Sequence, residues 1–339
     1  MIDSFSQEVL NPLVRGTNLE RAEAREALTS ILEGHVEGVL IASFLTALTA
    51  KGETADEMTG FIDAMIATAT TFDIGPDAID IVGTGGDQLH TVNISTMASL
   101  ALAGCGVRVA KHGNRAASSS VGSADVLEAL GVRLDAPESV VRSCVEGAGI
   151  GFLFAPTFHH ALGYLTPIRR ALGFRTVFNV LGPLANPALV KRSLIGVAQD
   201  HLLDNMAQVL GARGVDYAIL VNSEDGLDEL SLGAPANLRL ITPMGTQIRR
   251  IDAAQELGVS HDVASIRGGD VHHNVEVVRD FLDGVRGPVF DVVCANAGLA
   301  LMVARRADSL REGFDIAAEG VLSGRAAVAL ERLVSISND

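Results

Sequence analysis

Residues 80–125 read DIVGTGGDQLHTVNISTMASLALAGCGVRVAKHGNRAASSSVGSAD, and this stretch decides the fold. The apolar run 78–82 breaks into GTGGD at 83–87, which is typical of a strand that stops in a glycine-rich turn. Glycines there allow positive φ and bring backbone N–H groups close to an anion. NIST at 93–96 then leads into an apolar helix, which its asparagine, serine or threonine can cap, and the helix N-terminus adds further donors.

A second short strand, 107–110, ends in KHGNR at 111–115. If the two strands are neighbours in a parallel sheet, Lys111 and Arg115 face the same mouth as the glycine turn. Ordinary turn chemistry would explain one such junction, but three donor-rich junctions with two cations indicate a phosphate site. The glycine spacing is neither G-x-G-x-x-G nor G-x-x-x-x-G-K-[ST], which argues against a dinucleotide site or a P-loop NTPase.

The periodicity of the whole chain predicts an α/β fold. A small N-terminal helical domain is expected over residues 1–72, and a larger α/β domain with a mostly parallel central sheet over 73–339. The expected helices of the first domain span 19–33, 36–50 and 55–70. The expected strands of the second are 78–82, 107–110, 151–154, 193–197, 217–222 and 237–241, and its expected helices are 95–104, 123–131, 138–147 and 202–212, followed by a helical tail from 275 to 337.

Composition excludes several function classes. The 339 residues carry a net charge of −15, which disfavours nucleic acid and anionic membranes as partners. No apolar window approaches the ~20 residues of a transmembrane helix, and the first residues lack the features of a signal peptide. The three scattered cysteines are typical of buried small residues in a reducing compartment, so we expect a cytoplasmic protein.

GTGGD, NIST and KHGNR, followed by GSADVLEALG, resemble the anthranilate phosphoribosyltransferases, which share a fold with the pyrimidine nucleoside phosphorylases. The resemblance continues through FAP (154–156), LTPIRR (165–170), FNVLGPLANP (178–187), DGLDEL (225–230) and CANAGLAL (294–301), and it covers essentially the whole chain. It implies that residues 158–187 return to the helical domain and that the protein is a homodimer. It also implies a Mg²⁺-dependent transfer of the 5-phosphoribosyl group of phosphoribosyl pyrophosphate (PRPP) to the amino group of anthranilate, with release of pyrophosphate, in tryptophan biosynthesis.

The resemblance carries over to individual positions. For PRPP it implies Gly83, Gly86, Asp87, Thr91, Asn93, Ile94, Ser95, Thr96, Lys111, Asn114, Ser119 and Ser123. For anthranilate it implies Gly83, His112, Asn114, His159, Arg169 and Gly182, with Arg169 facing the carboxylate and Arg170 solvated. For the metal it implies Ser95, Asp228 and Glu229, oxygen ligands of the kind that Mg²⁺ prefers. No residue is assigned as a general acid or base, because the aromatic amine is a neutral nucleophile.

The chain departs from the family pattern mainly on the acceptor side. The departures are His160, Leu162, Gly163, Tyr164, Ala116, Ala117, Ser120, Val121, Asn222 and Ser223. They leave open the same transfer to another aromatic amine, such as a substituted aminobenzoate. A nucleoside phosphorylase is disfavoured by the KHGNR and FNVLGPLANP segments. A non-catalytic relative that binds nucleic acid is disfavoured by the charge and the intact GTGGD, NIST and Asp228-Glu229.

Overall fold

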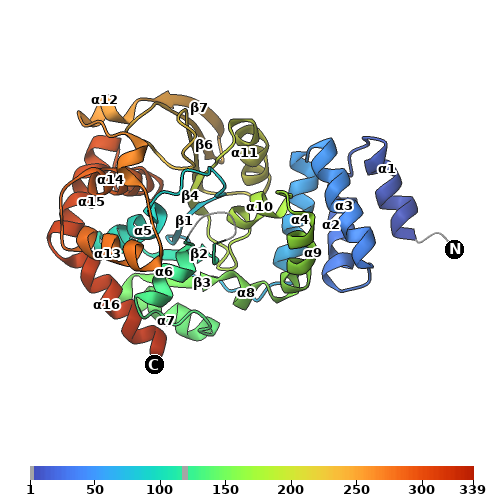
Figure 1. The fold of residues 1–339 in the computed structure, drawn as a ribbon, viewed down its shortest axis with the longest axis horizontal. Coiled ribbons are helices and arrows are strands. Elements are labelled where there is room, and N and C mark those ends of the chain that lie inside the picture. The colour runs from blue at the N-terminus through green and yellow to red at the C-terminus, as the bar shows by residue number, and fades with distance from the viewer. Residues whose placement is uncertain (1–3, 117–120) are drawn as a thin grey trace.

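The computed structural model describes residues 4–116 and 121–339 and consists of two units. Figure 1 shows the N-terminal helices as a separate bundle on the right and the sheet with its covering helices on the left. The chain begins at the outer end of the bundle and ends on the α/β unit. Among the described residues, no helix is long and apolar enough to cross a membrane.

The α/β unit is built on a seven-stranded sheet with the order β3-β2-β1-β4-β5-β6-β7. The strands from β1 to β5 pair in parallel, and β6 and β7 add an antiparallel edge. The strands are β1 (Ile79–Gly83), β2 (Val109–Gly113), β3 (Ile150–Phe154), β4 (Arg192–Gly196), β5 (Tyr217–Ser223), β6 (Ala236–Thr242) and β7 (Gly245–Ile251). The mostly parallel sheet predicted from the sequence is therefore confirmed.

Two details of the sheet differ from the sequence prediction. Strand β2 runs on to Gly113, so Lys111 and His112 belong to the strand and not to the loop after it. Strand β7 was not predicted, because its side chains are exposed almost throughout and show no apolar alternation. It is an edge strand, and only its antiparallel pairing with β6 identifies it as a strand.

Helices cover both faces of the sheet. The apolar core on one face joins α5, α13, α14, α15 and α16 to strands β1, β2 and β5, and these helices lie left of the sheet in Figure 1. The helices of this unit are α5 (Ile94–Gly104), α6 (Ser123–Ala129), α7 (Glu138–Ala148), α8 (Ala155–Phe158), η4 (Asp200–Leu202), α11 (Leu203–Ala212), α12 (Ala253–Leu257), η5 (Val263–Ile266), α13 (Val271–Leu282), α14 (Pro288–Val303), α15 (Leu310–Leu322) and α16 (Arg325–Asn338). Cys144 and Cys294 are buried as expected, whereas Cys105 is half-buried.

The helical unit and the opposite sheet face share one core. Phe44 and Phe61 of the bundle belong to the same apolar cluster as Val177 and Leu181, far along the chain, and Leu203 of α11. The bundle contains η1 (Ser6–Leu10), α1 (Asn11–Val14), α2 (Arg21–Leu32), α3 (Gly38–Lys51) and α4 (Ala55–Ala67). The later segment contributes η2 (His160–Leu165), α9 (Thr166–Leu172), α10 (Phe178–Leu181) and η3 (Gly182–Leu184). Apolar side chains between Leu165 and Ala185 thus share the core of the N-terminal helices.

The strand order reverses direction between β1 and β4. In open α/β sheets, the loops that leave two such neighbours diverge and form a crevice at their carboxyl ends. The GTGGD segment follows β1 at this point, and Thr84 N–H donates to Gly196 O at the end of β4 (2.9 Å). The fold therefore places the glycine turn where ligands of such sheets bind.

Candidate active site

Residues 83–87, here called the glycine loop, approach the acidic segment after β5. Gly85 N–H donates to Asp228 Oδ2 (2.7 Å). A Cβ on Gly83 would lie 2.7 Å from the same oxygen, so only glycine allows this approach. Gly85 and Gly86 have φ of 60° and 81°, which favours glycine. The loop after β1 and the loop after β5 therefore form one site.

Asp228 is buried at this site, and the neighbouring Glu229 is half-buried. Glu229 Oε1 accepts a hydrogen bond from Ser95 N–H at the start of α5 (3.2 Å). Burial raises the pKa of Asp228 and of Glu229, and the nearby Asp87 carboxylate raises both further. Lys111 and Arg175 offset only part of this effect, so three neighbouring carboxylates would gain from a further cation. In the described part of the chain, no three His, Cys, Asp or Glu side chains are placed to hold a metal ion.

Lys111 lies beneath the site and is only 1% exposed. Its Nζ donates to Ile81 O (2.8 Å) and to Ser95 Oγ (3.3 Å). Burial lowers the pKa of Lys111 to about 8, while Asp80 and Glu229 counteract the shift. The expectation that Lys111 lies on a loop after its strand was wrong. Lys111 belongs to β2, and its buried side chain extends to Ile81 O and Ser95 Oγ.

The start of α5 supplies further donors. Thr96 Oγ1 is buried and has no hydrogen-bond partner among the described residues, so a ligand oxygen at the helix N-terminus would satisfy it. Ile94 is buried, and Thr91 forms an isolated bridge with Arg267. Asn93 occupies the N-cap position but its side chain makes no cap hydrogen bond. Its amide instead donates to Val121 O (3.1 Å) and accepts from Asn274 Nδ2 (3.0 Å).

Several predicted site residues lie in or next to segment 117–120, which the structure does not describe. Ser119 lies outside the described residues. Ser123 Oγ donates to Asn114 O (3.4 Å), and Asn114 is exposed. Arg115 was predicted to face the mouth together with Lys111, and the structure shows its guanidinium paired with Asp125 (3.0 Å) and Glu128 (2.7 Å). A charge already paired on α6 contributes little to binding an anion elsewhere.

Three residues predicted for the acceptor lie together, and a fourth, Arg169, lies on α9. The rings of His112 and His159 have centroids 5.4 Å apart, and the Gly182 backbone lies close to the His112 side chain and acts on its pKa. His112 Nε2 is buried and unpartnered among the described residues. Arg169 stacks on Phe178, with its Cζ 5.3 Å from the ring centroid, and burial lowers its pKa. Arg170 is exposed, as expected.

The departures from the family pattern have structural partners. His160 Nε2 and Thr70 Oγ1 are hydrogen-bonded (3.0 Å), and Tyr164 Oη donates to Val36 O (3.0 Å). Leu162 packs against the core of the helical unit, and no atom lies near a Cβ built on Gly163. Asn222 Nδ2 donates to Val197 O (2.8 Å) after β4. His160 and Tyr164 thus fasten the returning segment to the bundle.

Three important residues were missed from the sequence. Asp80, inside the apolar strand β1, accepts from His112 N–H (3.1 Å) and from Asn186 Nδ2 (2.8 Å). Asn186 also donates to Ala110 O (2.8 Å), so it joins the GPLANP segment to β1 and β2. A charge in an otherwise apolar strand was the available signal for Asp80. Arg175, described below, had no comparable signal.

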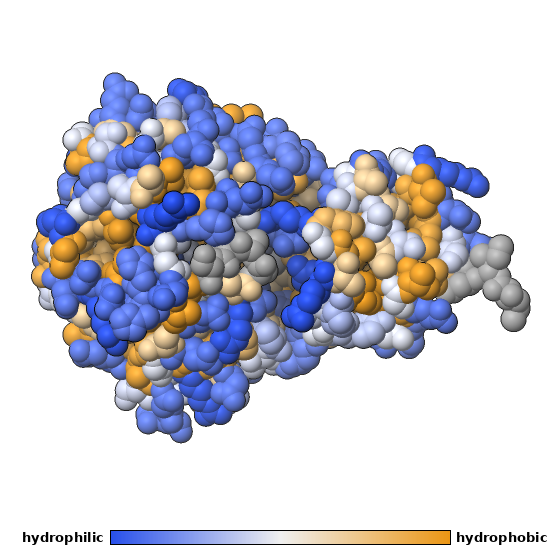
Figure 2. All heavy atoms as spheres, in the orientation of Figure 1, coloured by the Kyte–Doolittle hydropathy of each residue, from blue (hydrophilic) through white to orange (hydrophobic). Residues whose placement is uncertain are grey.

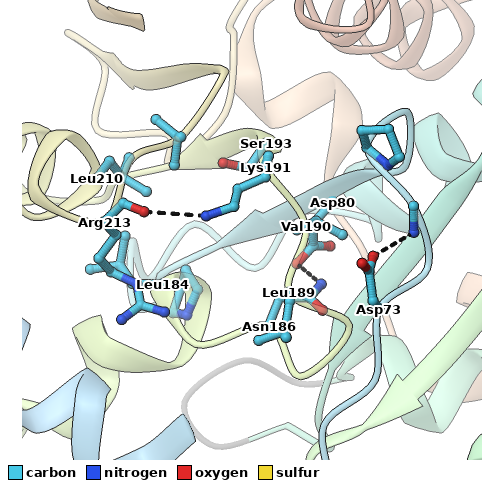
Figure 3. A pocket seen from close by; sticks show the side chains of 14 residues that line it. Asp73, Asp80, Leu184, Asn186, Leu189, Val190, Lys191, Ser193, Leu210 and Arg213 are labelled. Atoms are coloured by element: carbon cyan, nitrogen blue, oxygen red, sulfur yellow. Dashed lines mark hydrogen bonds between the residues drawn. The ribbon is translucent and has the colours of Figure 1, made fainter. Parts of the chain in front are cut away.

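A cavity of about 340 Å³ lies at the opposite, amino-terminal ends of β1 and β4. Figure 3 shows Asp80 and Asn186 facing each other at its wall, with Lys191 reaching toward Arg213. Lys191 Nζ donates to Arg213 O (3.3 Å). The cavity shares Asp80 with the acceptor side but lies at the end of β1 opposite the glycine loop.

The buried state of His112 predicts a pH effect on stability. Burial, reinforced by His159, lowers the pKa of His112 to about 3, whereas an unfolded histidine has a pKa of about 6.5. Between these values only the unfolded chain binds the proton, so His112 reduces stability as the pH falls below about 6.5. We expect His112→Asn to lose less thermal stability than the wild type between pH 7.5 and pH 5, as measured by differential scanning calorimetry. An equal loss of thermal stability in the two proteins over this pH range would contradict the claim that the His112 ring is buried in its neutral form.

Comparison with known proteins agrees with this arrangement. Residues 75–327 match the a/b domain of a glycosyl transferase family, and residues 7–69 match its helical bundle domain. Anthranilate phosphoribosyltransferase of Thermomicrobium roseum is 48% identical over 97% of this chain and 96% of its own length. That of Dehalococcoides mccartyi strain CBDB1 is 41% identical over 98% of each.

Solved structures show the same fold. The crystal structure of anthranilate phosphoribosyltransferase from Thermus thermophilus superposes with a TM-score of 0.91 at 39% identity, covering 98% of this chain and all of that one. The Saccharomyces cerevisiae enzyme in complex with PRPP and Mg superposes with a TM-score of 0.89 at 25% identity, covering 99% and 98%. With its two domains, its glycine loop and its acidic pair in place, the chain belongs to the anthranilate phosphoribosyltransferase family.

Proposed function

We propose that this chain transfers the 5-phosphoribosyl group of PRPP to the amino group of anthranilate and releases pyrophosphate, as a step of tryptophan biosynthesis. The observation that carries the proposal is the meeting of Asp228 and Glu229 with the glycine loop and the start of α5. Backbone donors, a helix N-terminus and a carboxylate pair together suit a diphosphate and its divalent cation. Anthranilate is proposed as the acceptor because the chain belongs to the anthranilate phosphoribosyltransferase family.

The PRPP side of the proposal uses the residues around the acidic pair. Donors for the diphosphate are assigned to the glycine loop, to the start of α5 and to Lys111. Asp228, Glu229 and Ser95 Oγ would hold Mg²⁺, which fits the raised pKa values of the two acids. When bound, this ion neutralises charge on the departing pyrophosphate. Lys111 holds Ser95 Oγ from below and adds a fixed positive charge.

The acceptor side of the proposal uses the residues around His112. Arg169 would face the anthranilate carboxylate, and His112, His159, Asn114 and Gly182 would orient the ring and amine. His112 is neutral, so it can exchange a hydrogen bond without bringing a charge near the developing positive centre on the ribose. The chain's contribution is to align the amine and to stabilise the leaving group, and no proton-transferring pair is required.

Product analysis tests this proposal directly. We expect purified protein with PRPP, Mg²⁺ and anthranilate to form a product whose mass equals anthranilate plus one phosphoribosyl group. Its formation should stop when a chelator removes the metal. A folded protein that releases ribose phosphate without joining it to anthranilate would overturn the acceptor assignment.

We also propose a cytoplasmic homodimer, with a domain of residues 1–72, to which 158–187 return, and an α/β domain over 73–339. The support for the dimer is an exposed apolar face on the outer helices. Val14 and Val39 are 74% and 67% exposed, and small residues of α3 beside them line a shallow groove. Figure 2 shows apolar side chains gathered over α1 and the helices next to it. A second copy of the same face is a self-complementary occupant.

Charge placed on this face should separate the subunits. We expect Val39→Asp to convert a wild-type dimer into a monomer at micromolar concentration, measured by light scattering after size exclusion, because a buried unpaired carboxylate opposes association. Val285→Asp, at a 56% exposed position on the α/β unit, is the matched control and should stay dimeric. A monomeric wild type, or a dimeric Val39→Asp variant, would refute this interface.

A further inference from the structure

Arg175 connects the two units at the glycine loop. It lies between α9 and α10, in the segment that packs with the helical unit. Its Nη2 nevertheless donates to Thr84 O (3.3 Å), inside the loop that follows β1 of the α/β unit. The guanidinium therefore comes from a segment that packs with the helical unit, and it lies against the glycine loop of the α/β unit.

The glycine loop is shaped around this guanidinium. A Cβ atom built on Gly86 would overlap Arg175 Nη1 and also approach Cζ. Gly86 has a φ of 81°, so both the backbone conformation and the space above it require glycine. The planar head thus occupies the position that a side chain at residue 86 would fill.

The Arg175 guanidinium lies near two carboxylates, and one of its nitrogen atoms has no hydrogen-bond partner among the described residues. Asp228 and Asp87 attract its charge, although burial lowers the pKa of Arg175. Nη1 is buried and has no hydrogen-bond partner among the described residues. A buried donor without a partner costs free energy, and a ligand oxygen would remove that cost. Thr84 O uses Nη2, so Nη1 is the atom left for a ligand.

We propose that Arg175 is a binding residue for the diphosphate of PRPP, to which its guanidinium donates through Nη1. The inference rests on the proposed function and adds a residue to its PRPP site. A guanidinium suits phosphate because its fixed donors match the phosphate oxygens. Its position on the glycine loop, and not beside His112, selects the diphosphate over the acceptor. Because Arg175 comes from the returning segment, the same contact would hold the helical unit against the bound substrate.

Binding measurements on four proteins test this role. The chain contains no tryptophan, so isothermal titration calorimetry is the suitable method, with PRPP and inorganic pyrophosphate each titrated in the presence of Mg²⁺. The proteins are the wild type, Arg175→Ala, Arg175→Lys and Arg170→Ala, the last an exposed arginine on the same segment. Steady-state kinetics give KM for anthranilate, and thermal unfolding reports stability.

We expect Arg175→Ala to weaken both PRPP and pyrophosphate by about ten-fold or more, because a charge-assisted hydrogen bond is lost. KM for anthranilate should stay unchanged, Arg175→Lys should recover part of the affinity, and Arg170→Ala should bind as the wild type. Wild-type affinity in Arg175→Ala, or a loss confined to anthranilate, would overturn the inference. If Arg175→Ala does not fold, wild-type PRPP affinity in Arg175→Lys counts against the inference and reduced affinity supports it. A wild type that binds no PRPP would instead refute the proposed function itself.

Discussion

Asp228→Asn and Glu229→Gln are each expected to lower kcat/KM by at least about 100-fold, the loss of several kcal/mol of charge stabilisation in the transition state. Each substitution removes an anionic oxygen from the proposed magnesium site. The neutral amides keep the shape of the side chains, so the effect would come from charge. Because the two carboxylates are ligands of one ion, the double variant should be little worse than either single variant.

The same substitutions should leave the protein folded. Burial raises the pKa of both acids, which means that the folded chain favours their neutral forms. Removing either charge therefore relieves repulsion, and the thermal midpoint without metal should be unchanged or higher. Glu224→Gln is the matched control, since Glu224 lies close in the chain but pairs with Arg250 at the surface (2.6 Å). Wild-type rates in Asp228→Asn at saturating Mg²⁺ would remove Asp228 from the metal site.

Arg169→Ala should raise KM for anthranilate by about ten- to 100-fold, in line with the loss of a hydrogen bond to a charged group. Arg169 is held by its stacking on Phe178, and no carboxylate pairs with it among the described residues, so its donors are available. KM for PRPP should not change. Initial-rate kinetics with each substrate varied in turn provide the measurement.

Two comparisons make the Arg169 prediction specific. Arg170→Ala, which changes an exposed neighbour on α9, should behave as the wild type. An aromatic amine without the carboxylate should be a poor acceptor for the wild type and should lose little further activity in Arg169→Ala. Equal losses for both acceptors would show that Arg169 supports the fold of the segment and does not bind the carboxylate.

Much of the fold could be predicted because its signals are local. Strands β1 and β5 combine short apolar runs with glycine or polar stops, and α5 begins at a recognisable polar junction. Strand β7 could not be predicted, because its side chains face solvent and only its partner β6 defines it. The register and burial of an edge strand depend on the strand with which it pairs. The residue pattern within the edge strand does not show that partner.

The candidate site was less predictable than the fold. Lys111 and Arg115 look equivalent in the sequence, yet one is buried beneath Ser95 and the other is paired with Asp125 and Glu128 on α6. Which face of β2 a side chain leaves, and which acids lie near it, depend on the packing of distant segments. Arg175 shows the same limit, because its contact with Gly86 joins residues from separate units.

Pyrophosphate release from PRPP and Mg²⁺, measured with anthranilate and with a panel of substituted aminobenzoates, tests the central claim most directly. We predict that anthranilate gives the highest kcat/KM of the panel and that Asp228→Asn lowers release at least about 100-fold with every acceptor. A different aminobenzoate as the best substrate would contradict the anthranilate assignment. No release with any acceptor, from protein shown to be folded, would contradict the enzyme itself.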